Sequence, residues 1–206
     1  MKIFFARHGE SQANILHEIS NRGLKHPLTL KGREQAFLLA QKLKDENISY
    51  IYSSPVLRAI ETTVLVAGQL AIDYEVTEAL REYDMGELEG RSDDKTWELW
   101  KELFDAWAIH RRWEQHMPGG ETFYDVQKRF LPFIQGLIDR HKRTDTNILC
   151  IGHGGLYWMM LPLALKNVNF AFIQRHGAFP YASWVTSELK QGILFCIKWN
   201  EVIVDP

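Results

Sequence analysis

The stretch Lys2–Ser11, KIFFARHGES, decides the fold, because an apolar run stops abruptly at an arginine, a histidine and a glycine. A strand of a parallel sheet is buried on both faces and therefore has a continuous apolar sequence. The residues IFFA fit such a strand, so Arg7 and His8 are expected at its carboxyl end. Ligands of open α/β sheets bind in the crevice outside those ends. Arg7 and His8 are therefore candidates for a functional site.

Composition favours a single domain of residues 1–206. The chain is 46% hydrophobic and 24% charged, which is enough for one sizeable core and too short for two comfortable domains. A net charge of −2 gives no support for a nucleic-acid-binding surface. No apolar run approaches the ~18 residues that span a bilayer, and the apolar stretch before Arg7 is too short for a signal peptide. Cys150 and Cys196 lie in apolar, strand-like runs, so we expect buried, reduced thiols in a cytoplasmic protein.

Strand and helix patterns alternate along the first part of the chain. Residues 31–47 have apolar side chains at helical spacing, and residues 48–54 form a β-branched and aromatic run that is typical of a strand. Residues 54–70 predict the next helix, with Ser54 as its N-cap and Pro55 at its first position. This order indicates βαβ units and a parallel sheet.

The second half completes the predicted architecture. A long core-facing helix is expected after the turn MPGGE, and NILCIGHGG at residues 147–155 repeats the opening pattern, with a helix beginning near Leu156. The last strands are expected to form a hairpin around Lys190 to Gly192. We therefore expect a three-layer α/β sandwich whose mainly parallel sheet is flanked by helices, with a small helical cap inserted at about residues 84–120.

Several charged side chains follow the predicted strands. His8 and His153 each stand beside a glycine at a strand end, Arg58 follows the second strand by about one helical turn, and Glu82 lies in a later loop. If the strands are neighbours, this concentration of positive charge makes sense around a bound anion, helped by backbone N–H groups after Gly154. A phosphoryl group is the most plausible anion, because guanidinium groups stabilise the charge on its oxygens.

Histidine can also act as a nucleophile and split one difficult transfer into two easier steps. Attack requires a neutral imidazole, and the leaving alkoxide requires a proton. Glu82 could donate that proton if burial raises its pKa.

At this point the chain resembles the histidine phosphatase superfamily, which also contains the cofactor-dependent phosphoglycerate mutases. The resemblance rests on six segments in the family's order, which are RHGES with Asn14 following, LTLKGREQA, SSPVLRAIET, LREYDMGELEG, PGGET and IGHGG. It implies a phosphatase that uses neither a metal nor another cofactor and acts on a small phosphate ester. Its partners would include no nucleic acid and no membrane, and a monomer and a homodimer both remain possible.

The resemblance also implies roles for particular residues. His8 would be the phosphorylated nucleophile, and Glu82 would be the proton donor. Arg7, Arg58 and His153 would form the phosphate pocket. Four further residues are expected at the substrate-binding site, and they are Asn14, Ser20, Tyr83 and Gly154.

Simpler interpretations compete at several positions. Asp84, Glu87 and Glu89 are rivals of Glu82 as the acid. Arg81 is expected to orient its loop, and Ser53 and Ser54 are expected to be turn and cap residues. Six other histidines are expected to be structural or to lie on the surface, namely His17, His26, His110, His116, His141 and His176.

The cap leaves two questions open. Trp97, Trp100, Phe104 and Trp107 lie at helical spacing, which favours packing, although an aromatic wall that selects the leaving group is the alternative. Tyr83 and Met85 are candidates to face the same group.

The reaction also has alternatives. Lys95, Arg111 and Arg112 place basic groups in the cap, which is reminiscent of a mutase, although they can equally form solvated ion pairs. The short spacing of 71 positions between Glu82 and His153 favours a phosphatase. A non-catalytic module that binds a phospho-ligand is the second alternative.

Overall fold

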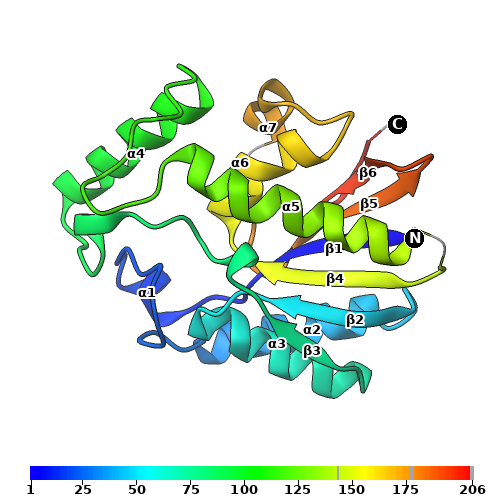
Figure 1. The fold of residues 1–206 in the computed structure, drawn as a ribbon. Helices are drawn as coiled ribbons and strands as arrows, with labels where there is room; N and C mark the ends of the chain where they lie inside the picture. The colour runs from blue at the N-terminus through cyan, green and yellow to red at the C-terminus, as the bar shows by residue number, and fades with distance from the viewer. Residues whose placement is uncertain (143, 177–178, 205–206) are drawn as a thin grey trace.

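The computed structural model describes residues 1–142, 144–176 and 179–204. Within these residues, seven strands form one sheet with helices on both faces (Figure 1). The strands are β1 (Lys2–Arg7), β2 (Ile48–Ser53), β3 (Tyr74–Val76), β4 (Asn147–Gly152), β5 (Trp184–Lys190), β6 (Ile193–Trp199) and β7 (Val202–Ile203). The helices are α1 (Gln12–Ile15), α2 (Leu30–Leu43), α3 (Leu57–Leu70), α4 (Asp94–Ala108), α5 (Phe123–His141), α6 (Gly154–Ala164) and α7 (Phe170–His176), with short 3-10 turns η1 (Glu78–Leu80) and η2 (Gly86–Leu88).

The sheet is mixed, with the order β3-β2-β4-β1-β5-β6-β7. Strands β1 to β4 run parallel to one another. Strand β5 pairs antiparallel with β1, and β6 and β7 continue the sheet in antiparallel pairs beyond it. The predicted α/β fold is thus confirmed, and so is the C-terminal hairpin. In the parallel half, Arg7 of β1 pairs with Gly152 of β4, and Ser53 of β2 pairs with Ile151. Because of this register, the carboxyl ends of the three strands lie together.

The alternation of side chains along β1 builds two cores. Phe4 and Ala6 pack toward α2 and α3 on one face, whereas Ile3 and Phe5 belong to a larger core with α5 and α6 on the other. All four side chains are fully buried, as expected of a central parallel strand. Figure 1 shows α2 and α3 on one side of the sheet and α5 and α6 on the opposite side.

The predicted start of the second helix is wrong by a few residues. Helix α3 begins at Leu57 with Val56 as its N-cap, rather than at Pro55 with Ser54 as the cap. The hydroxyl group of Ser54 accepts from the backbone N–H of Val56 at 3.3 Å and also contacts the ring of His153 at 2.7 Å. Helix α6 begins at Gly154, slightly earlier than expected.

Residues 84–120 contain η2 and α4, and we call them the cap segment. In Figure 1, α4 lies with α1 on the side toward which the arrowheads of β2 and β4 point. The side chain of Asp93 caps α4 by accepting a hydrogen bond from the N–H of Thr96 at 3.1 Å. The cap segment therefore reaches the edge of the sheet where the candidate residues emerge.

Two further expectations concern the core and the membrane. Cys150 and Cys196 are buried and unpaired, as predicted. Among the helices of the described residues, none combines the length and the apolar character needed to cross a bilayer.

Candidate active site

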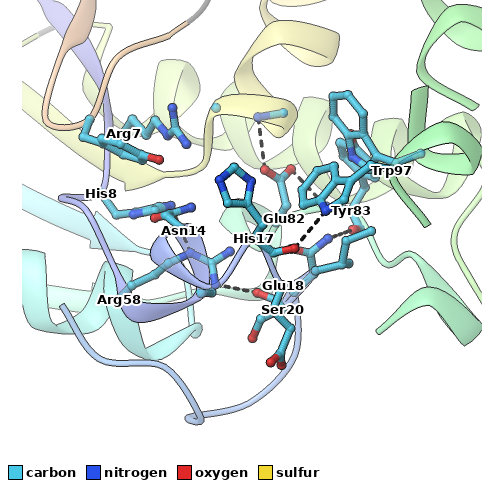
Figure 2. A pocket seen from close by; sticks show the side chains of 17 residues that line it. Arg7, His8, Asn14, His17, Glu18, Ser20, Arg58, Glu82, Tyr83 and Trp97 are labelled. Carbon is cyan, nitrogen blue, oxygen red and sulfur yellow. Dashed lines mark hydrogen bonds between the residues drawn. The ribbon is translucent and has the colours of Figure 1, made fainter. Parts of the chain in front are cut away.

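A cavity of about 310 Å³ lies outside the carboxyl ends of β1, β2 and β4. Figure 2 shows its lining side chains, with Arg7, His8 and Arg58 on one side and Tyr83 and Trp97 on the other. We call the first of these regions the inner part, and its lining residues include Arg7, His8, Asn14, Ser20, Arg58 and Gly154. Most of the sequence-predicted binding residues thus line one cavity. His153 does not line it, because this side chain is fully buried and contacts Arg58 and the ring of His8 instead.

The position of His8 follows from the end of β1. Its backbone N–H donates to the carbonyl of Gly152 on β4 at 3.0 Å, which holds it beside the neighbouring strand. Arg58 donates from Nε to His8 Nε2 at 2.9 Å. Because a guanidinium group can only donate, Nε2 carries a lone pair, and Nδ1 carries the proton that it gives to the carbonyl of Gly9 at 2.6 Å.

Arg58 also connects the two histidines. Its Nη2 lies 3.2 Å from Nδ1 of His153, and its Nη1 donates to the carbonyl of Ser20. His153 Nδ1 must therefore accept, so Nε2 of this ring donates to Ser54 Oγ. The rings of His8 and His153 approach with centroids 5.1 Å apart. One guanidinium group thus fixes both tautomers.

Both histidines are held in their neutral form. Burial is the main reason that the pKa of His8 lies well below its usual value, and the charges of Arg58 and Arg7 lower it further. The pKa of His153 is lowered in the same way by burial and by Arg58. Arg58 itself has a pKa of about 10, lowered by burial, and so remains charged at neutral pH.

Arg7 has one donor group in use and another without a partner. Its Nη1 donates to the carbonyl of Phe179 at 2.6 Å, and its Cζ lies 4.1 Å from the ring centroid of Tyr181. Its buried Nε hydrogen-bonds to no group in the described parts of the chain. A buried donor without a partner is costly, and the residue that carries it lines a cavity with room for an anion.

Asn14 offers a further donor to the inner part. Its amide oxygen accepts from the backbone N–H of Ser11 at 3.0 Å and from the Ser11 hydroxyl at 2.8 Å, within a capping box at the start of α1. The NH₂ group of Asn14 therefore remains as the part that a ligand can meet. Ser20 and Gly154 also line the cavity, as expected.

Glu82 lies at the cavity wall and accepts two backbone hydrogen bonds. They come from the N–H of Gly155 at 3.0 Å and from the N–H of Tyr83 at 3.2 Å. Burial raises the pKa of Glu82 above its usual value, although Arg58 and the two N–H groups oppose that rise. Gly155 permits this arrangement, because a Cβ at this position would lie 2.9 Å from the carboxylate.

None of the three rival carboxylates lines the cavity, and two of them are hydrogen-bonded within the protein. Asp84 forms a bidentate pair with Arg22, and Glu89 accepts from the backbone N–H of Asn21. Glu87 is exposed and, like the other two, does not line the cavity. Arg81 forms ion pairs with Glu78, Asp84 and Glu121, as expected of a residue that orients its loop.

Some aromatic residues of α4 line the cavity, as an aromatic wall would, and others pack in the core. Trp97 and Trp100 line the cavity, as does Tyr83. Trp107 is fully buried in the core, and Met85 is buried with it. Packing and pocket lining thus occur on the same helix.

Several lining residues were not identified as site residues from the sequence, among them His17, Glu18 and Tyr181. His17 and Glu18 follow α1, where no pattern distinguishes them from surface residues, and His17 was expected to be structural or exposed. Tyr181 comes from the loop before β5, far along the chain from every matched motif. The basic cap residues Lys95, Arg111 and Arg112 are exposed and do not line the cavity.

Comparison with known proteins places the chain in a family. Residues 3–202 match the model of the histidine phosphatase superfamily (branch 1). A Hydrogenobacter thermophilus protein, whose name proposes it as phosphoserine phosphatase 2, is 30% identical over 154 residues, covering 75% of this chain and 73% of the relative. Phosphoglycerate mutase-like protein 4 of Arabidopsis thaliana is 30% identical over 171 residues, covering 80% and 73% respectively.

A solved structure gives the same result. That of Bacillus stearothermophilus YhfR superposes with a TM-score of 0.82 at 28% identity, covering 98% of this chain and 97% of the other. The fold of the sheet, the position of the cavity and the family match over residues 3–202 all point to the same family. The chain therefore belongs to branch 1 of the histidine phosphatase superfamily and is a phosphatase-type enzyme.

Proposed function

We propose that the protein hydrolyses the phosphate monoester of a small metabolite, without a metal ion, through a phosphohistidine intermediate on His8. The observation that carries the proposal is the neutral His8, whose Nε2 lone pair lies at a buried site between two guanidinium groups. These features support a role for His8 as the nucleophile and for the two guanidinium groups as ligands of an anionic phosphoryl group.

Phosphate binding would use donors that now have no partner or a weaker one. Arg7 lines the cavity, and so does Arg58, whose Nε now donates to a neutral imidazole. The amide nitrogen of Asn14 and the backbone N–H of Gly154, the first residue of α6, add further donors. Hydrogen bonds from guanidinium to phosphate are stronger than neutral ones, so binding would compensate for the burial of both arginines.

The first step forms a bond from His8 Nε2 to phosphorus while the bond from phosphorus to the ester oxygen breaks. Glu82 donates its proton to that oxygen, and the alcohol leaves. In the second step water attacks phosphorus and gives its proton to the Glu82 carboxylate, and the bonding electron pair returns to Nε2. The raised pKa of Glu82 supports the first role, since it increases the protonated fraction near neutral pH.

We further propose that residues 84–120 act as a cap on a single domain. Trp97 and Trp100 of this segment line the cavity, and Trp97 donates from Nε1 to the carbonyl of His17 at 2.8 Å. The two free, buried thiols fit a cytoplasmic location. Hydrolysis is favoured over phosphoryl return to a sugar acid, because the basic cap residues lie away from the cavity.

A panel of phosphate monoesters, tested with chelator present, would examine this proposal. Wild type is expected to release phosphate, His8→Ala is expected to lose that activity, and His116→Ala, changed at an exposed histidine, is expected to keep it. Interconversion of 3-phosphoglycerate in the presence of 2,3-bisphosphoglycerate, without release, would show a mutase. Tight binding of esters without turnover would show a non-catalytic module.

A further inference from the structure

The part of the cavity beyond the phosphate-binding residues has its own chemistry. We call it the outer part, and it is lined by His17, Glu18, Tyr83, Trp97 and Trp100. A total volume of about 310 Å³ is near the lower end of the range for ligand pockets. The inner part would take the phosphoryl group, so the remaining space fits a small alcohol.

Two indole rings form a wall of the outer part. Trp97 and Trp100 pack against each other with ring centroids 5.8 Å apart. Behind them, Phe104 stacks on Trp100 at 5.1 Å and contacts Trp158 of α6 at 4.4 Å. This series of rings fixes the wall to the helix beside the active site, so little ordering remains to be done when a ligand binds.

The indole N–H of Trp97 already has a hydrogen-bond acceptor within the protein. This N–H donates to the carbonyl of His17 at 2.8 Å, and the two rings lie edge to face at 6.4 Å. A ligand therefore meets the apolar surface of the indole rather than a free donor. Figure 2 shows Trp97 and Tyr83 together on the side of the cavity opposite His8.

Among the described residues, no arginine or lysine lines the outer part to pair with a second anionic group. Among the described lining residues, the arginines are Arg7 and Arg58, which both belong to the inner part, and none is a lysine. The nearest charge in the outer part is the carboxylate of Glu18, which pairs with Lys25 and His26 outside the cavity. A carboxylate on the alcohol would thus lie near Glu18 with no arginine or lysine to pair with, which is costly.

We propose that the outer part selects an uncharged, ring-bearing alcohol, so that the substrate is a small phosphate monoester with an aromatic ring and no second anionic group. This inference rests on the proposed function for the identity of the phosphate site. It makes carboxylate-bearing esters poor substrates and poor ligands.

Binding of two matched phosphonates tests the inference without requiring turnover. Benzylphosphonate and phosphonoacetate share the CH₂–PO₃ group and differ in having a phenyl ring or a carboxylate. Calorimetry with the wild-type protein is expected to show benzylphosphonate binding at least about tenfold more tightly. Equal affinities, or tighter binding of phosphonoacetate, would overturn the proposal.

Variants of Trp97 and Trp100 test whether these two indole rings cause the preference for benzylphosphonate. Trp97→Ala and Trp100→Ala are each expected to weaken benzylphosphonate binding by about tenfold and to leave phosphonoacetate unchanged. Tyr124→Ala removes a partly exposed aromatic residue of α5 that does not line the cavity, and it should change neither affinity. An unchanged preference in both tryptophan variants would contradict the proposal.

The two proposals fail in different ways. If the ring preference is observed but no monoester is hydrolysed, the proposed activity is wrong and the binding inference holds. If esters are hydrolysed through His8 with no ring preference in binding, the activity holds and the inference fails.

Discussion

The ring of Tyr181 covers the guanidinium group of Arg7, with 4.1 Å between Arg7 Cζ and the ring centroid. On the same loop, the carbonyl of Phe179 accepts from Arg7 Nη1 at 2.6 Å. The loop before β5 therefore holds Arg7 from two sides. The centroid of the Tyr181 ring also lies 6.3 Å from that of His8. Tyr181 would therefore help to position both Arg7, a proposed ligand of the phosphate, and the ring of His8.

Removal of that ring is expected to weaken phosphate binding. Tyr181→Leu loses a cation–π contact worth about 1 kcal/mol, so KM for a phosphate ester and the inhibition constant of orthophosphate should each rise by about fivefold. Tyr181→Phe keeps the ring and should remain close to wild type. Inhibition by orthophosphate in both variants, with Tyr124→Leu as a control distant from the cavity, measures this. Similar losses in the Phe and Leu variants would show that the hydroxyl group, not the ring, is responsible.

The role of Glu82 predicts a dependence on the leaving group. Glu82→Gln is expected to lower kcat for an alkyl phosphate by about 10²–10⁴-fold, because the alkoxide then leaves without a proton. An aryl phosphate such as p-nitrophenyl phosphate leaves as a stable anion and should lose much less. Single-turnover rates for both esters test this expectation. Equal losses for the two would indicate that Glu82 does not protonate the leaving group.

The close contact at Gly155 predicts a second effect on Glu82. A Cβ here would lie 2.7 Å from a ring carbon of Tyr83 and 2.9 Å from Glu82 Oε2, so Gly155→Ala should displace the carboxylate and lower kcat for alkyl esters. Gly136→Ala is the matched control. Its Cβ meets nothing within 4 Å in helix α5, and it should stabilise the protein by about 0.5–1 kcal/mol with activity unchanged. Wild-type activity in Gly155→Ala would show that the position of Glu82 tolerates this shift.

The neutral histidines predict how stability depends on pH. Since burial lowers the pKa of His8 in the folded protein below 6.5, the unfolded chain binds a proton there that the folded chain does not. Stability is therefore lost as pH falls below about 6.5 toward the folded pKa. The raised pKa of Glu82 acts in the opposite direction, because it favours protonation of the folded state.

A comparison of variants separates these contributions. Urea denaturation at about pH 7.5 and about pH 5 should show a smaller acid-side loss in His8→Asn than in wild type. His116→Asn, changed at the surface, should lose as much as wild type. An identical loss in wild type and His8→Asn would show that His8 is not held neutral.

Much of this site was predictable because strand ends mark it. The apolar runs before Arg7 and His153 predict buried parallel strands, and their register then brings both residues to one edge. Glu82 was found through its motif, and the structure adds the two N–H groups that orient it.

Other features depend on tertiary contacts that no local pattern encodes. Trp100 and Trp107 are seven positions apart and share a face of α4, yet Trp100 lines the cavity whereas Trp107 packs against Tyr83 and Phe123 in the core. Only the tertiary packing along α4 separates the two. Ser54 has the sequence of a helix cap, but its hydroxyl also contacts His153, which follows β4 far along the chain. Tyr181 reaches Arg7 through a loop with no distinguishing sequence.

The most direct test of the central claim is to trap the covalent intermediate. The enzyme would be mixed with an ester, quenched in alkali within the first turnover, and digested for mass spectrometry under alkaline conditions, in which a phosphorus–nitrogen bond survives. We predict phosphate on His8, absent in His8→Ala and released when the quenched protein is acidified. Phosphate on another residue, or product formed in the first turnover with His8 unmodified throughout, would contradict the account.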